Sequence, residues 1–103
     1  MSVSGLSVGS SVVRDMARLA AVEVPGILRV GRGGPPWRGW GRRSVVAKRH
    51  GEVVTVRIWV VARPGRALGA VTAEVRAAVT TTIERLLGLE VGSVTVVVDG
   101  IGG

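Results

Sequence analysis

The stretch VVTVRIWVVAR (residues 53–63) decides the predicted fold. It alternates in side-chain character at every second position, as a β-strand does, because successive side chains point to opposite faces. One face is entirely apolar and is expected to lie in the core; it consists of Val54, Val56, Ile58, Val60 and Ala62. The opposite face mixes valine and threonine with Arg57, Trp59 and Arg63. We therefore predict a strand that is buried on one side and half apolar on the other.

A long helix and a final strand are predicted after this stretch, which Pro64 and Gly65 end. Residues 67–87 repeat apolar side chains three and four positions apart, which indicates one buried helical stripe. The stripe consists of Leu68, Val71, Val75, Val79, Ile83 and Leu86. Gly88 stands where a left-handed C-terminal cap belongs. Residues 94–98 alternate again and predict the last strand.

A helix and two short strands are predicted before residue 53. Residues 10–22 have helical spacing, with Ser10 or Ser11 as a candidate N-terminal cap. The expected apolar face consists of Val12, Val13, Met16, Leu19 and Ala20. Residues 27–30 and 44–49 are apolar enough for strands, and Gly51 suits a tight turn before the next one.

The predicted fold class is α+β. The 103 residues suffice for a single small domain, residues 1–103, with the element order α-β-β-β-α-β. We expect a four-stranded sheet with both helices on one face. Short connections favour antiparallel neighbours among the first three strands, whereas the long helix permits a crossover to the fourth.

A basic segment, GRGGPPWRGWGRR (residues 31–43), interrupts this pattern. Its glycines and its Pro35-Pro36 pair exclude a helix or a central strand, so we predict a surface loop between the first two strands. No acidic residue lies between Glu23 and Glu52, and the chain has a formal net charge of +7. Such a local positive field attracts anions on lipid, nucleic acid or protein.

The loop and the mixed strand face supply the candidate interaction residues. They are Arg32, Trp37, Arg38, Trp40, Arg42, Arg43, Arg57 and Trp59. Tryptophan can stack on bases while arginine pairs with phosphate, which indicates nucleic-acid binding as one function. The same side chains suit an anionic lipid surface or a protein partner. Alternatively, Trp37 and Trp40 pack on their own domain and cover its small core.

Catalytic and metal-binding patterns are weak in this chain. Gly5-Leu6-Ser7-Val8-Gly9 fits the G-x-S-x-G pattern, but it lacks the preceding strand and the larger sheet that a nucleophile elbow needs. His50 is the only histidine and there is no cysteine, so three or four convergent metal ligands are not expected. The G-x-x-G pattern at residues 31–34 follows a strand, whereas that of a KH domain joins two helices. We expect no enzyme, no cofactor, no metal and no small-molecule substrate.

Four segments resemble, in order, the motifs of one bacterial family. AAVEVPGI (residues 20–27) resembles A-A-x-E-V-x-G-V, which closes the first helix. Residues 53–65 resemble the long strand that ends in a glycine turn. TIERLLGLEV (residues 82–91) is similar to V-E-x-M-T-G-L-x-V, and VTVVVDGI (residues 94–101) to V-N-V-x-V-x-G-I. These are motifs of the alkaline shock protein family, also called the general-stress or envelope stress response family.

The resemblance implies a non-enzymatic interaction or scaffold protein of the envelope stress response. Family members can sit beneath the membrane by binding an integral membrane protein, so a membrane-anchored partner and a cytoplasmic location are expected. Self-association remains open, and so does nucleic-acid binding through the basic loop. No catalytic residues are implied. The loop at residues 31–43 departs from the family pattern in being unusually basic and rich in tryptophan.

Overall fold

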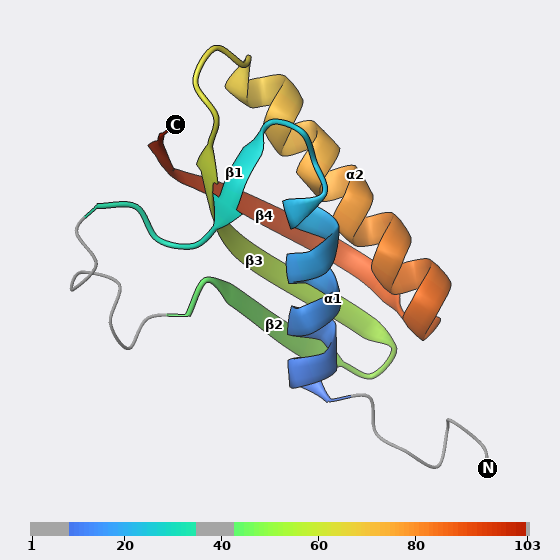
Figure 1. Ribbon diagram of the computed structural model, residues 1–103. Coiled ribbons are helices and arrows are strands. Elements are labelled where there is room, and N and C mark those ends of the chain that lie inside the picture. The colour runs from blue at the N-terminus through green and yellow to red at the C-terminus, as the bar shows by residue number, and fades with distance from the viewer. Residues whose placement is uncertain (1–8, 35–42, 103) are drawn as a thin grey trace.

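The computed structural model describes residues 9–34 and 43–102 and confirms the predicted order of elements (Figure 1). The elements are α1 (Ser10–Val22), β1 (Ile27–Val30), β2 (Val45–His50), β3 (Val53–Ala62), α2 (Leu68–Leu87) and β4 (Glu90–Ile101). The last strand is longer at both ends than its alternating core at residues 94–98 indicates. The α+β class, the four-stranded sheet and the two helices are those predicted from the sequence.

Strand β3 is the centre of the sheet and pairs with each of the other strands. It is antiparallel to β1 and β2 and parallel to β4. The parallel pair follows from α2, which carries the chain back along the sheet before β4 begins. The mixed sheet therefore has β4 on one side of β3 and both β1 and β2 on the other.

The antiparallel neighbours expected among the first three strands are β1 with β3 and β2 with β3, and β1 and β2 themselves lie end to end along the same edge of β3. The backbone of Trp59 joins both: its carbonyl accepts from the N–H of Gly31 at 2.8 Å, and its N–H donates to the carbonyl of Ser44 at 2.8 Å. Since the N–H and C=O of one strand residue point to the same side, both bonds lie on one edge. The chain therefore leaves this edge of β3 at Gly31 and returns to the same edge at Ser44, and both points lie opposite Trp59.

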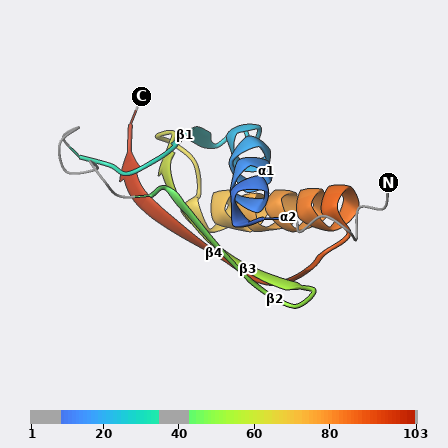
Figure 2. The same cartoon turned by 90° about the horizontal axis from the view of Figure 1, so that it is seen from below.

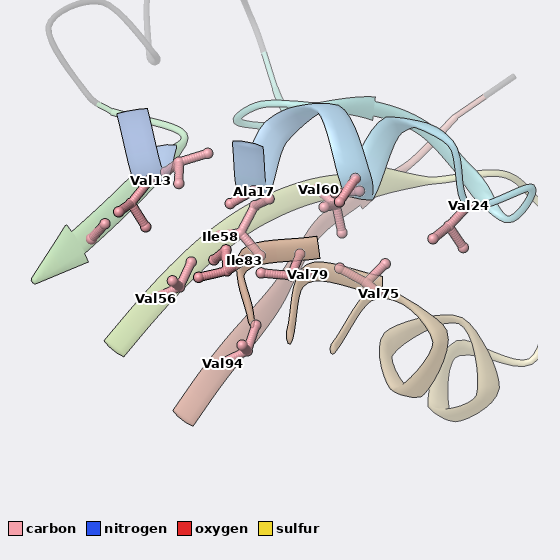
Figure 3. Packing of buried hydrophobic residues seen from close by; sticks show 14 of the residues in the cluster. Val13, Ala17, Val24, Val56, Ile58, Val60, Val75, Val79, Ile83 and Val94 are labelled. Carbon is pink, nitrogen blue, oxygen red and sulfur yellow. The ribbon is translucent and has the colours of Figure 1, made fainter. Parts of the chain in front are cut away.

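Both helices cover the same face of the sheet, as Figure 2 shows. Their buried side chains meet the even-numbered residues of β3 in one apolar core (Figure 3). The core residues of α2 are Val71, Val75, Val79 and Ile83, and those of α1 are Val13, Ala17, Ala20 and Ala21. Fully burying a valine or isoleucine side chain contributes about 1.5–3 kcal/mol, so this layer is the main source of stability.

Some predicted helix faces are corrected by the structure. Leu68 is 37% exposed and Leu86 is 67% exposed, so the stripe of α2 is confirmed only between Val71 and Ile83. Leu68 and Leu86 stand at the two ends of α2, beyond the part that packs in the core. In α1, Val12 and Leu19 are 41% and 60% exposed, because alanines face the sheet in their place.

Glycines occupy one cap of each helix and the tight turn between β2 and β3. Gly88 has a φ of 67° and caps α2 through an N–H bond to the carbonyl of Glu84, as predicted. Gly51 has a φ of 61° in the β2–β3 turn. The N-cap of α1 is Gly9 and no side-chain bond caps this helix, so the expected serine cap is wrong. No helix in the described part of the chain is long and apolar enough to cross a bilayer.

Candidate interaction surface

The sheet face that lies away from α1 and α2 is called the open face here, and it carries two of the predicted site residues. Arg57 is exposed and Trp59 half-buried on this side of β3. Their odd-numbered positions place them opposite the core residues of the same strand. A shallow groove of about 390 Å³ lies on the open face; its lining residues are Val46, Lys48, Thr55, Val56, Arg57, Trp59, Ser93 and Thr95.

The strand register explains why these side chains meet. Arg57 is paired with Val46 of β2 on one side and with Thr95 of β4 on the other. The next row of the open face places Thr55 between Lys48 and Ser93. Residues paired across adjacent strands point to the same face, so each row runs straight across the sheet. The groove is therefore built from three strands and needs the parallel register of β4.

The base of the loop lies against Trp59. The guanidinium carbon of Arg32 is 3.7 Å from the centroid of the indole ring. The Nε of Arg32 donates to the carbonyl of Arg43 at 3.3 Å, and Arg29 donates to the carbonyl of Arg32 at 3.1 Å. A cation over an indole ring contributes about 0.5–1 kcal/mol at an exposed site. Both ends of the loop are thus fixed to the open face at the same aromatic residue.

Gly33 anchors the loop base to β4. Its N–H donates to the Oδ2 of Asp99 at 2.7 Å, and a Cβ at this position would collide with the Asp99 carbonyl oxygen. Because Gly31 is bonded to the opposite edge of β3, the chain at 31–33 crosses over β3 on the open face. Val61 points away from the helices and is only 5% exposed; its side chain lies beside Gly100 of β4, as does the α-carbon of Gly33. We call residues 31–33 the strap.

The structure brings together half of the predicted site residues. Arg32 contacts both the Trp59 ring and the backbone carbonyl of Arg43, and Arg57 lies on the same face two positions from Trp59. The remaining four lie outside the described residues; they are Trp37, Arg38, Trp40 and Arg42.

Sequence reasoning missed Asp99 and the strap. Asp99 is an exposed residue near a strand end, and nothing in its local pattern marks it as an anchor. The glycines at 31 and 33 were a signal, since glycine permits close backbone approach.

The residues tested for chemistry stand apart from this surface. His50 is exposed at the end of β2, beside the turn. Ser7 of the G-x-S-x-G pattern lies outside the described residues. Among the residues that the structure describes, no three histidines, cysteines or carboxylates are close enough to hold a metal ion.

These features define a class of protein: a two-layer α+β domain with one sheet face open, basic and partly apolar. Solved structures of the MamM CTD share the fold. The manganese form of one variant superposes with a TM-score of 0.56 at 17% identity, covering 89% of this chain and 99% of that chain. The copper form of another gives a TM-score of 0.57 at 16% identity, with 89% and 98% covered. At such identities the likeness shows the fold alone.

The family is shown by the sequence as a whole. The model of the alkaline shock protein 23 family, described as having a cell envelope-related function, matches residues 2–102. The chain belongs to this family, which confirms the resemblance carried by its four motifs. No curated protein matches the chain.

Proposed function

We propose that this protein is a non-enzymatic interaction protein of the cell envelope, which binds a membrane-anchored protein through its open face and the adjoining loop. The cell envelope-related function of the family supports this proposal. The partner would hold the protein at the inner side of the membrane. The further support comes from the composition and geometry of the open face.

The groove beside Trp59 is the observation on which the proposal rests. It combines an aromatic ring, aliphatic and methyl-bearing side chains and two cations on a rigid sheet. Tryptophan and arginine dominate the binding energy of many protein interfaces, especially at positions that neighbours keep dry. The strap fixes the Trp59 ring before a partner arrives, which lowers the entropy lost on binding.

The charges of this surface indicate the chemistry of the partner. Lys48 and Arg57 line the groove, and the guanidinium of Arg32 lies over Trp59 at its border. Asp99 is engaged by the N–H of Gly33. A partner segment with acidic side chains flanking an apolar one would complement this pattern, and charge complementarity mainly sets the association rate and the choice of partner.

Quantitative affinity capture from native cells tests the proposal. Arg57→Glu reverses a charge in the groove, and Arg76→Glu makes the same change on an exposed position of α2. We expect Arg57→Glu to lose the membrane-protein partner by at least about tenfold while Arg76→Glu retains it, with equal melting temperatures. Equal capture by both variants would contradict the proposal.

The loop is tested in the same capture. The double change of Trp37 and Trp40 to Ala removes its two aromatic anchors. A loss of partner at an unchanged melting temperature assigns the tryptophans to the interface, where each is worth about 2 kcal/mol or more. A large fall in melting temperature would instead show that they pack on their own domain, and the loop would then be dropped from the proposed interface.

Nucleic-acid binding is the second candidate, favoured by cations and an indole together on an open sheet face. The stacking of Arg32 on Trp59 counts against it, since the guanidinium occupies the ring face that a base would use. The salt dependence of RNA and DNA binding separates the two. A loss of affinity of about a thousandfold between 50 and 200 mM salt would indicate phosphate neutralisation.

A further inference from the structure

The two edges of the sheet meet the solvent in different ways. The β1–β2 edge is divided into two short strands, and it bears exposed cations at Arg29, Lys48 and Arg49. Short strands and charged side chains are the devices by which natural sheets prevent unwanted strand pairing. This edge is therefore protected.

The β4 edge has none of these devices along its middle. β4 extends over 12 residues and, among the described strands, pairs only with β3. No charged residue and no proline stands between Glu90 and Asp99. Val96 and Val97 are only half-buried. At the start of β4 the Glu84 carboxylate accepts from the N–H of Val91 at 3.3 Å, so the uncharged part of the edge lies beyond this residue. That uncharged part is a template for another strand.

The ladder with β3 determines which backbone groups of β4 are free. Ala62 pairs with Ile101, and its carbonyl accepts from the N–H of the next residue, Gly102, at 3.0 Å. Ile58 pairs with Val96 in the same parallel pattern. The backbone of Ile58 is therefore bonded to Thr95 and Val97, the two neighbours of Val96 in β4. The N–H and C=O groups of Val94, Val96 and Val98 consequently point away from β3, toward the free edge.

We propose that this edge pairs antiparallel with β4 of a second copy of the chain, so that one continuous sheet runs through a two-fold dimer. The edge is self-complementary about Val96. Val94 then lies opposite Val98 on the helix side, and Thr95 opposite Val97 on the open face. Ser93 meets Asp99, so no like charges stand opposite each other.

The distribution of charge favours a second copy at this place. The formal net charge of +7 makes copies repel each other, and the only charged residues of β4 are Glu90 and Asp99. Pairing through β4 therefore joins the copies where cations are fewest. It also places both open faces on the same side of the joined sheet, because a two-fold axis normal to the sheet preserves its faces. The dimer does not depend on the proposed partner, but it would present two grooves together.

Sedimentation equilibrium of the full chain measures the dimer directly. We expect the mass to rise from 10.7 kDa toward twice that value as the concentration rises from about 10 µM to about 1 mM, as suits a small interface. Added salt should strengthen the dimer, since it screens the repulsion between like-charged copies. Thr95→Lys should raise the dissociation constant at least about tenfold, whereas Thr81→Lys, the same change on exposed α2, should leave it within about threefold.

Disulfide trapping is the second measurement and does not rely on a destabilising change. The chain has no cysteine, so a single introduced one can only join two copies. Val96 would meet its own copy across the two-fold axis, with the two Cα atoms about 5.5 Å apart, a separation at which disulfides form. Val96→Cys should therefore form the covalent dimer under mild oxidation at least about tenfold faster than Thr81→Cys on exposed α2.

Two results would overturn the proposal. One is a chain that keeps its single-copy mass at about 1 mM in the sedimentation experiment. The other is an equal trapping rate for Val96→Cys and Thr81→Cys. That result would show that β4 does not pair with a second copy and would make a strand of a different protein the candidate for this edge.

Discussion

At the scale of single residues, Gly33 decides whether the strap can lie on the open face. Its N–H reaches the Asp99 carboxylate, and its α-carbon lies against the backbone of β4. The φ of Gly33 is not positive, so an alanine there is free of backbone strain and tests the close approach alone.

We predict that Gly33→Ala destabilises the fold by about 1–3 kcal/mol in a denaturant titration, since the new methyl group must displace the strap from Asp99. Trp59 fluorescence should change as Arg32 leaves its ring. Gly69→Ala is the control: nothing lies near its Cβ in the first turn of α2, so it should be neutral or stabilise by up to about 1 kcal/mol. Equal stability of Gly33→Ala and the parent would show that the strap is not held here.

The sequence was informative about single residues only in part. Trp59 stood out because the chain has only three tryptophans, and Arg32 and Arg43 stood out because no acidic residue lies between Glu23 and Glu52. Their contact was not predictable, since it depends on how the loop re-enters the sheet edge opposite Trp59. Asp99 carried no local signal, because its partner is a backbone N–H distant in the sequence.

At the scale of elements, periodicity predicted each helix and strand because one face of each is apolar. The placement of β1 and β2 relative to each other was not predictable from the sequence, for a physical reason. A connection as long as residues 31–44 permits either a hairpin or an end-to-end arrangement, and the hydrogen bonds of Trp59 select the second. The outer positions of the predicted α2 stripe were wrong, because the ends of this helix extend beyond the sheet that buries its middle.

The middle of α2 should be the most sensitive element. Val75 is fully buried, so Val75→Asp places an unpaired carboxylate in the core and should cost more than about 3 kcal/mol. The melting temperature should fall by roughly 12 °C or more, since each kcal/mol corresponds to about 4–8 °C in a domain of this size. Ala77→Asp, exposed on the same helix, should melt within a few degrees of the parent. If the two variants melt alike, the facing of α2 is wrong.

At the scale of the whole molecule, the two faces of the sheet have separate tasks. The helix side contains the apolar core, and the open face combines a groove, a fixed tryptophan and several cations. The family and the fold were predictable from the sequence, because the motifs lie in the elements that build the core. The groove was not, since the parallel register of β4 brings its third wall into place.

Site-specific photo-crosslinking in native cells tests most directly whether the open face binds a protein. A photoreactive residue replaces Thr55, which lines the groove, or Thr81, which is exposed on α2. We predict that the Thr55 position crosslinks to one membrane protein and that the Thr81 position does not. Crosslinking from Thr81 to the same protein at equal yield, or from Thr55 to nucleic acid alone, would contradict the account.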